Sequence, residues 1–112
     1  MKQRVVELTE FGAAENMRLI EADIPIPGPG QIVVKNNAIG LNYLDTYFRS
    51  GLYPWPNQEN IKIPGSEGVG HVHAVGSDVT FHKEGDKVSY VTPVGAYAEY
   101  ALINAAHAVQ LK

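Results

Sequence analysis

Short stretches with strand character follow one another along this chain at close intervals, each marked off by glycine or proline. The 112 residues include 11 glycines and 7 prolines. Segment 25–30, Pro-Ile-Pro-Gly-Pro-Gly, cannot be regular structure, because proline lacks the N–H donor and glycine favours turns. This punctuation leaves room for short strands and little room for long helices.

Most of the stretches between these breaks have strand character, and one has helical spacing. We predict strands at 2–9, 17–24, 31–39, 68–75, 87–91, 96–103 and 108–111, the first two forming a hairpin. Leu41, Leu44 and Phe48 predict a helix over 41–50 with these three residues on one face, and Gly51 is placed to end it. Short strands with one short helix indicate a β-barrel or sandwich rather than a βαβ fold.

Length and composition limit the kind of protein. A chain of 112 residues with 45% hydrophobic and 19% charged residues is expected to form one globular domain. The net charge is −3 and the basic residues are scattered, which argues against a nucleic-acid partner. Glu7 lies where a signal peptide would need apolar residues, and no apolar run approaches the ~20 residues of a membrane span. The chain has no cysteine, so disulfides and thiolate metal sites are excluded, and we expect a cytoplasmic protein.

Asn42 and Asp45 stand where a helix would begin. Asparagine is a favoured N-cap, and an acid three residues later completes a capping box. Asp45 and Arg49 are also four residues apart, in the order that favours an ion pair on a helix. A helix N-terminus offers free N–H groups to a ligand as well, so a structural role and a functional role are compatible.

Tyr47 and Tyr53 are candidates for hydrogen bonding to a substrate. Both could equally be ordinary packing aromatics. Tyr53 lies between Gly51 and Pro54, on a loop leaving the predicted helix, where side chains can face a cleft. A phenol with a pKa near ~10 stays protonated at neutral pH and can donate to an oxygen that gains negative charge.

Two further patterns invite a functional interpretation that we do not favour. Gly65, Gly68 and Gly70 lead into a strand rather than a helix, so close packing or a bend explains them better than a dinucleotide loop. His71 and His73 share one face of a strand and could share a metal. The remaining histidines, His82 and His107, have no neighbour that completes a ligand set, and a solvated strand face explains the histidines better.

Several motifs in a fixed order resemble the medium-chain dehydrogenase/reductase superfamily, in its zinc-independent quinone oxidoreductase branch (the zeta-crystallin-like proteins). They are the segments 27–35, 38–54, 63–70, 75–79, 81–88 and 95–100. The resemblance implies that residues 1–112 form a GroES-like domain, a partly open β-barrel with one or two short helices. It further implies a separate Rossmann cofactor domain, which we expect to lie outside residues 1–112.

The resemblance also implies an activity for the full-length enzyme: hydride transfer from NADPH to a quinone or other electrophilic carbonyl. We expect the full-length enzyme to be a homodimer, and residues 1–112 alone to be inactive and to bind NADPH weakly or not at all. Asp-Thr-Tyr-Phe-Arg-Ser-Gly at 45–51 favours the quinone branch. Two alternatives stay open: an enoyl-thioester reductase of the same superfamily, which carries a similar local pattern, and a stand-alone GroES-like binding module without catalytic activity.

Site residues follow from the same resemblance. Zinc-dependent members carry cysteine at the place of Asn42 and histidine at the place of Ser66, so no metal site is expected here. Asn42, Tyr47 and Ser66 would surround the nicotinamide. Tyr53 and Asn42 would hydrogen-bond the substrate oxygen, and Asp45 belongs to the same catalytic group.

Overall fold

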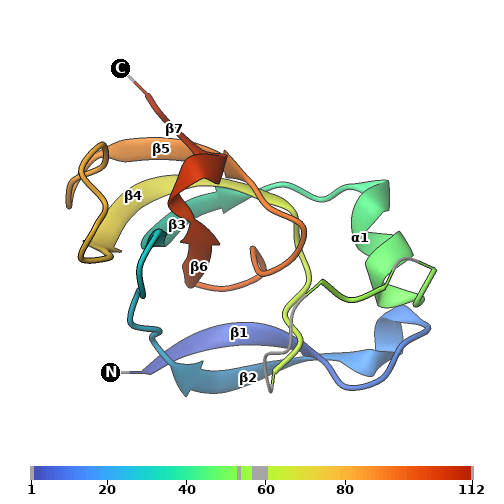
Figure 1. Cartoon of the computed structure of the whole chain (residues 1–112). Helices are drawn as coiled ribbons and strands as arrows, with labels where there is room; N and C mark the ends of the chain where they lie inside the picture. The colour runs from blue at the N-terminus through green and yellow to red at the C-terminus, as the bar shows by residue number, and fades with distance from the viewer. Residues whose placement is uncertain (1, 53, 57–60, 112) are drawn as a thin grey trace.

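The computed structural model of the protein describes residues 2–52, 54–56 and 61–111. A two-stranded hairpin lies beneath a five-stranded antiparallel sheet, and one α-helix stands beside both (Figure 1). The strands are β1 (Lys2–Leu8), β2 (Met17–Asp23), β3 (Gln31–Ile39), β4 (Glu67–Val75), β5 (Lys87–Val91), β6 (Tyr100–Asn104) and β7 (Ala108–Gln110). The helix is α1 (Tyr43–Arg49), and the 3-10 turns are η1 (Ala14–Asn16) and η2 (Ala105–His107).

The larger sheet has the strand order β6-β3-β4-β5-β7, so β6 and β7 are its edges over the described residues. Its inner face carries the core, in which Ile32, Val34, Val72, Val88 and Ile103 are almost completely buried. Along β4 and β5 buried residues alternate with more exposed ones, as expected of a sheet with one buried face, whereas Ile32, Val33 and Val34 of β3 are all buried. The mainly β, partly open GroES-like fold is therefore confirmed.

The hairpin is attached to the sheet by polar contacts as well as apolar packing. Val6 donates its N–H to the carbonyl of Tyr97 at 2.9 Å, and Val5 bridges to Ala98. The Gln3 side chain accepts the Tyr100 N–H at 2.8 Å and donates to the Tyr100 carbonyl at 3.1 Å. These bonds satisfy backbone groups of two segments that are far apart in sequence, which fixes the hairpin against β6.

Segment 96–99 was predicted as part of a strand running to 103, and this prediction is wrong for its first half. β6 begins only at Tyr100. The N–H groups of Ala96 and Tyr97 donate to Gly65 and Pro64, at 3.1 and 2.9 Å, instead of to a neighbouring strand. The segment is thus held by tertiary contacts that its alternating sequence does not reveal.

The C-terminal end of α1 is anchored to the loop after β1. Gly51 has φ +84°, the left-handed conformation of a residue that ends a helix, as predicted. Arg49 donates its Nε to the carbonyl of Gly12 at 3.1 Å, and Gly12 returns its N–H to the Arg49 carbonyl at 2.8 Å. The Phe48 ring meets Trp55 edge-on, with 6.3 Å between centroids. The helix is therefore fixed at this end by the 9–12 turn and by an aromatic contact.

Two predictions about α1 need correction. Leu41 was placed on its apolar face but precedes the helix and is 80% exposed. The Asp45–Arg49 ion pair is not among the salt bridges of the part of the chain that the structure describes. Arg49 is directed to the Gly12 carbonyl instead, and the Asp45 carboxylate is directed to other donors.

Candidate functional site

The N-terminus of α1 is built around one buried carboxylate. Asn42 is the N-cap, and it forms the predicted capping box with Asp45, whose side chain is only 6% exposed. Asp45 Oδ2 accepts the Asn42 N–H at 3.1 Å, and Oδ1 accepts the Ser66 hydroxyl at 3.2 Å. Asp45 is therefore more than a helix cap, since it also ties α1 to the start of β4.

Tyr97 supplies the shortest bond to this carboxylate. Its hydroxyl donates to Asp45 Oδ2 at 2.6 Å, a length typical of a hydrogen bond to a charged acceptor. Burial raises the pKa of the Tyr97 phenol far above its usual range, and the adjacent Asp45 carboxylate raises it further. Tyr97 therefore stays protonated and acts as a donor over the whole physiological pH range.

Ser66 lies in the interior, at 3% exposure. Its hydroxyl proton has two acceptors within reach, Asp45 Oδ1 at 3.2 Å and the Pro93 carbonyl at 3.0 Å. Its own carbonyl accepts the Thr92 N–H at 2.7 Å. The side chain thus faces Asp45 and segment 92–93, with almost no surface left for direct contact with a ligand.

The predicted site residues differ in their access to solvent. Asn42, the N-cap of α1, and Tyr47, within the helix, are both exposed and can contact a ligand laid against the helix. Asp45 and Ser66 are both buried and have little contact with solvent. Tyr53, the predicted hydrogen-bond donor to the substrate, lies outside the described residues, so its role stays a prediction.

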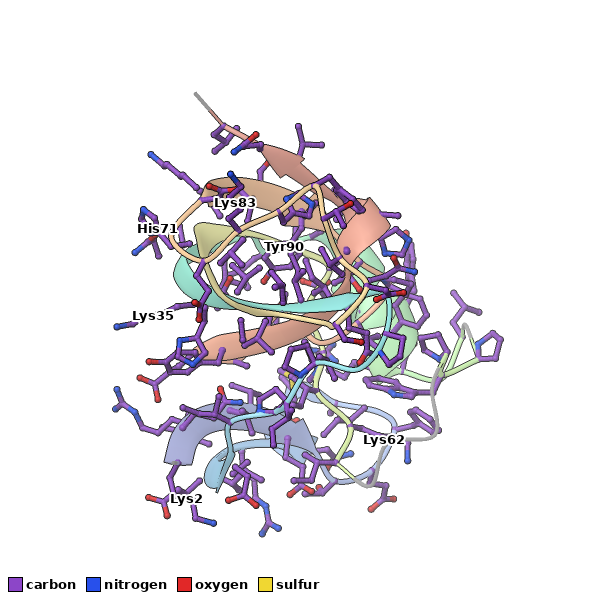
Figure 2. The ribbon with its side chains drawn as sticks, turned by 60° about the vertical axis from the view of Figure 1, so that its left-hand side comes forward. Lys2, Lys35, Lys62, His71, Lys83 and Tyr90 are labelled. Atoms are coloured by element: carbon purple, nitrogen blue, oxygen red, sulfur yellow. The ribbon has the colours of Figure 1, made fainter. Side chains whose placement is uncertain are left out.

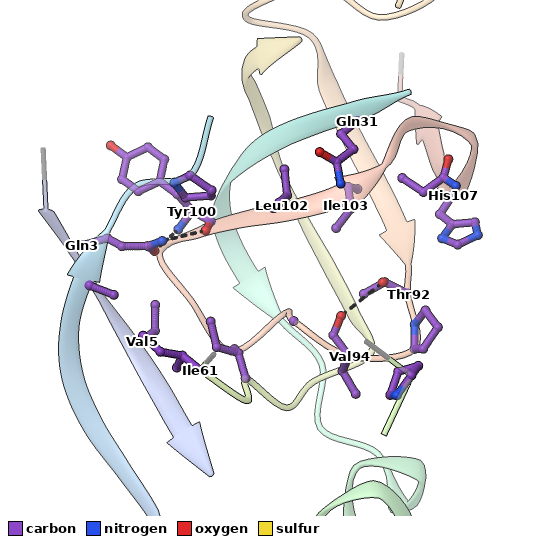
Figure 3. A pocket seen from close by; sticks show the side chains of 17 residues that line it. Gln3, Val5, Gln31, Ile61, Thr92, Val94, Tyr100, Leu102, Ile103 and His107 are labelled. Atoms are coloured by element: carbon purple, nitrogen blue, oxygen red, sulfur yellow. Dashed lines mark hydrogen bonds between the residues drawn. The ribbon is translucent and has the colours of Figure 1, made fainter. Parts of the chain in front are cut away.

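A cavity of about 600 Å³ opens between the hairpin and the larger sheet (Figure 3). It is lined mainly by apolar side chains of β1, β6 and segments 61–63 and 92–95, and its polar members include Gln3, Gln31, Thr92, Asn104 and His107. Asn42, Asp45 and Tyr47 do not line it. The cavity adjoins the Asp45 group through Thr92 and Pro93, which belong to its wall and hydrogen-bond Ser66.

The donor groups near α1 do not suit a zinc ion. An amide side chain and a hydroxyl bonded to Asp45 are poor zinc ligands. Within the described ranges, no group of three or more His, Asp or Glu side chains is arranged to hold a metal. His71 and His73 share the exposed side of β4, and Figure 2 shows His71 at the outer surface. His73 packs edge-on against the Tyr100 ring, with 4.9 Å between centroids.

His82 does not lie on a solvated face, and that prediction is wrong. It is 4% exposed, and its Nε2 lies 3.1 Å from the Ala105 carbonyl. Its Nδ1 has no hydrogen-bond partner in the structure. The ring is buried because the loop before β5 folds over η2, an arrangement that the local sequence does not signal.

The glycine run 65–70 serves packing, as predicted. A side chain on Gly70 would overlap the backbone carbonyl of Lys35 on β3, and one on Gly65 would overlap the ring of Tyr97. Tyr97 itself was missed as a site residue. The available signal was weak: a phenol two residues after Gly95, in a motif that also contains Glu99 and a second phenol, Tyr100.

Among the described residues, no helix is both long and apolar enough to cross a membrane.

Residues 28–112 match the alcohol dehydrogenase GroES-like domain family. A curated quinone oxidoreductase of Pseudomonas aeruginosa is 47% identical over 98 residues, which cover 84% of this chain and 29% of that protein. The chain therefore spans about three tenths of the length of this relative.

Solved structures of quinone oxidoreductases are also similar to this chain. The crystal structure of a quinone oxidoreductase from Pseudomonas syringae pv. Tomato DC3000 has a TM-score of 0.91 and 42% identity, covering 98% of this chain and 34% of the other. The Escherichia coli quinone oxidoreductase complexed with NADPH has a TM-score of 0.83 and 35% identity, covering 97% and 33%.

Proposed function

The chain belongs to the alcohol dehydrogenase GroES-like domain family, and we propose that it forms the substrate side of an NADPH-dependent quinone oxidoreductase. The resemblance to quinone oxidoreductases seen in the sequence agrees with the identities of 42% and 47% to such proteins. One observation carries the proposal in the structure. The positions of the two zinc ligands in zinc-dependent members hold Asn42 and Ser66, both organised around the buried Asp45.

Zinc-dependent members hold a zinc ion at these positions, where it acts as a Lewis acid. The present side chains can instead form hydrogen bonds. Asn42, exposed at the start of α1, is placed to orient a ligand by the N–H groups of its side-chain amide. Tyr47 lies on the same helix and presents an exposed ring. Tyr53 would donate to the substrate oxygen as it gains charge. NADPH, when bound, supplies the reducing power, and the protein supplies orientation and electrostatics.

Burial refines the expected roles within this group. Ser66 was expected to contact the cofactor, but its hydroxyl is committed to Asp45 and Pro93. We therefore assign Ser66 and Asp45 a supporting role, in which they hold Asn42 and the first turn of α1 in place. Asn42 and Tyr47 remain the proposed contacts to the nicotinamide.

The test is the activity of the full-length protein encoded by the gene. NADPH oxidation is measured with 1,4-naphthoquinone and, separately, with a crotonyl thioester. We expect turnover of the quinone, and a loss of about tenfold or more in kcat/KM for Asn42→Ala, as is typical when one positioned polar group is removed. Turnover of the thioester without turnover of any quinone would favour the enoyl-thioester reductase instead.

Residues 1–112 alone provide a second test. Because the cofactor domain is a separate part of the enzyme in this proposal, calorimetry with this chain and NADPH should show no binding at micromolar concentrations. Micromolar binding would contradict the proposal that a separate domain binds the cofactor.

We further propose that the full-length enzyme is a cytoplasmic homodimer, as the resemblance implies.

A further inference from the structure

We infer that Tyr97 is a positioning residue, whose hydroxyl sets the orientation of Asp45 and, through it, the place of Asn42 at the start of α1. This inference rests on the proposed function for its consequence in catalysis. Tyr97 is 52 residues from Asp45 in sequence and comes from the segment before β6. It therefore links α1 to the segment before β6, which is distant in sequence.

The Tyr97 residue is itself held firmly. Its N–H donates to the Pro64 carbonyl at 2.9 Å, and its carbonyl accepts the N–H of Val6 on β1 at 2.9 Å. The ring packs directly over Gly65, where even a Cβ would lie 2.4 Å from a ring carbon. Ring and backbone are thus fixed from both sides, so the hydroxyl has little freedom to move.

The hydroxyl reaches the oxygen of Asp45 that matters for the helix. Oδ2 accepts both the Tyr97 hydroxyl, at 2.6 Å, and the Asn42 N–H, at 3.1 Å. The other oxygen, Oδ1, accepts from Ser66. Without the Tyr97 hydroxyl, the carboxylate would keep one donor on each oxygen but lose the shortest of its bonds. The N-cap backbone would then depend on a carboxylate held only by the longer bonds from Asn42 and Ser66.

Packing alone does not require a hydroxyl at this position, because a phenylalanine ring would fill the space over Gly65 equally well. Tyr90 offers a comparison within the same molecule. It is also buried, and its hydroxyl donates to Asn36 Oδ1 at 2.8 Å. Asn36 in turn holds the carbonyls of Ala96 and Ala98, on either side of Tyr97. Tyr90 thus supports the same segment without a hydrogen bond to Asp45.

Tyr97→Phe and Tyr90→Phe are therefore a matched pair of variants, and both are made in the full-length protein. Each removes one hydroxyl that is hydrogen-bonded inside the domain, and both should lower the melting temperature. Only Tyr97→Phe should raise the KM for NADPH, by about tenfold, with kcat changed less than about threefold. A tenfold change in KM corresponds to weakening one hydrogen bond to a charged group. In an Asp45→Asn background, Tyr97→Phe should have little further effect on KM.

Hydrogen exchange of the peptide that covers 42–49 gives a readout that does not depend on activity. It should exchange faster in Tyr97→Phe and at the parent rate in Tyr90→Phe. Equal KM values and equal exchange in the two variants would overturn the inference. If the parent protein turns over no quinone, the proposed function fails, and exchange alone decides the positioning role: faster exchange only in Tyr97→Phe supports it, and unchanged exchange refutes it.

Discussion

Gly70 on β4 tests whether the glycine run serves packing or a cofactor. An added Cβ would lie 2.1 Å from the carbonyl oxygen of Lys35 and 2.9 Å from Val34 Cγ1, whereas ordinary contacts begin at 3.4 Å. Because the nearest atom belongs to the backbone of β3, no side chain can move aside to relieve the overlap. Strands β3 and β4, which are the centre of the sheet, would have to separate by more than about 1 Å at this point.

The cost of Gly70→Ala can be estimated from this geometry. Overpacking a tight interior costs about 1–3 kcal/mol, and weakening one or two ladder hydrogen bonds adds about 1 kcal/mol each. We expect a loss of about 3 kcal/mol in the free energy of unfolding and a melting temperature about 12 °C lower, taking ~4 °C per kcal/mol for a domain of this size. Urea unfolding and thermal denaturation of the protein measure both quantities.

Gly85→Ala is the control, since it places a Cβ in open space at a positive φ of 90°. It should cost only about 1–2 kcal/mol, the penalty of a left-handed conformation. If Gly70→Ala were no more destabilising than Gly85→Ala, the packing argument would be refuted. A normal melting temperature with weakened NADPH binding in the full-length protein would instead indicate a cofactor loop.

Two further predictions concern buried polar groups. Burial raises the pKa of Tyr90 from 10.0 to about 12, so the stability that the protonated phenol contributes is intact below pH 10 and is lost as the pH rises towards 12. In urea unfolding between pH 9 and 12, the free energy of unfolding of Tyr90→Phe should therefore fall by about 2–3 kcal/mol less than that of the parent. Parallel curves for the two proteins would contradict the assignment. Asp45→Asn should lower the free energy of unfolding by about 2–4 kcal/mol, because an amide nitrogen faces donors that need an acceptor. The control Asp78→Asn, whose exposed side chain can still accept the Gly30 N–H, should change it by less than about 0.5 kcal/mol.

Local features of the fold could be predicted from the sequence because their causes are local. The break at 25–30 and the β-branched runs beside it predict the bounds of β3, and Asn42 with Asp45 predicts the start of α1. Gly51 predicts its end. Each of these signals comes from residues within a few positions of the element concerned, so no knowledge of the tertiary structure is needed.

The contacts that shape the site could not be predicted in this way. Asp45 had a plausible local partner in Arg49, yet its bonds go to Ser66 and Tyr97, 21 and 52 residues away. A pattern of spacing carries no information about such partners. The burial of His82 has the same origin, since it depends on where η2 is placed by the strands around it.

The attachment of the hairpin to segment 97–100 has a consequence for synthesis of the protein. The β1–β2 hairpin needs only local contacts, but Arg4 donates to Glu99, 95 residues later. At ~5–20 residues per second, a ribosome takes on the order of 5–20 s to supply that partner. During this interval Val5, which is buried in the finished domain, lacks its bridge to Ala98. The hairpin of the nascent chain therefore exposes apolar surface until segment 97–100 is made, and a chaperone that binds apolar segments could occupy it during that time.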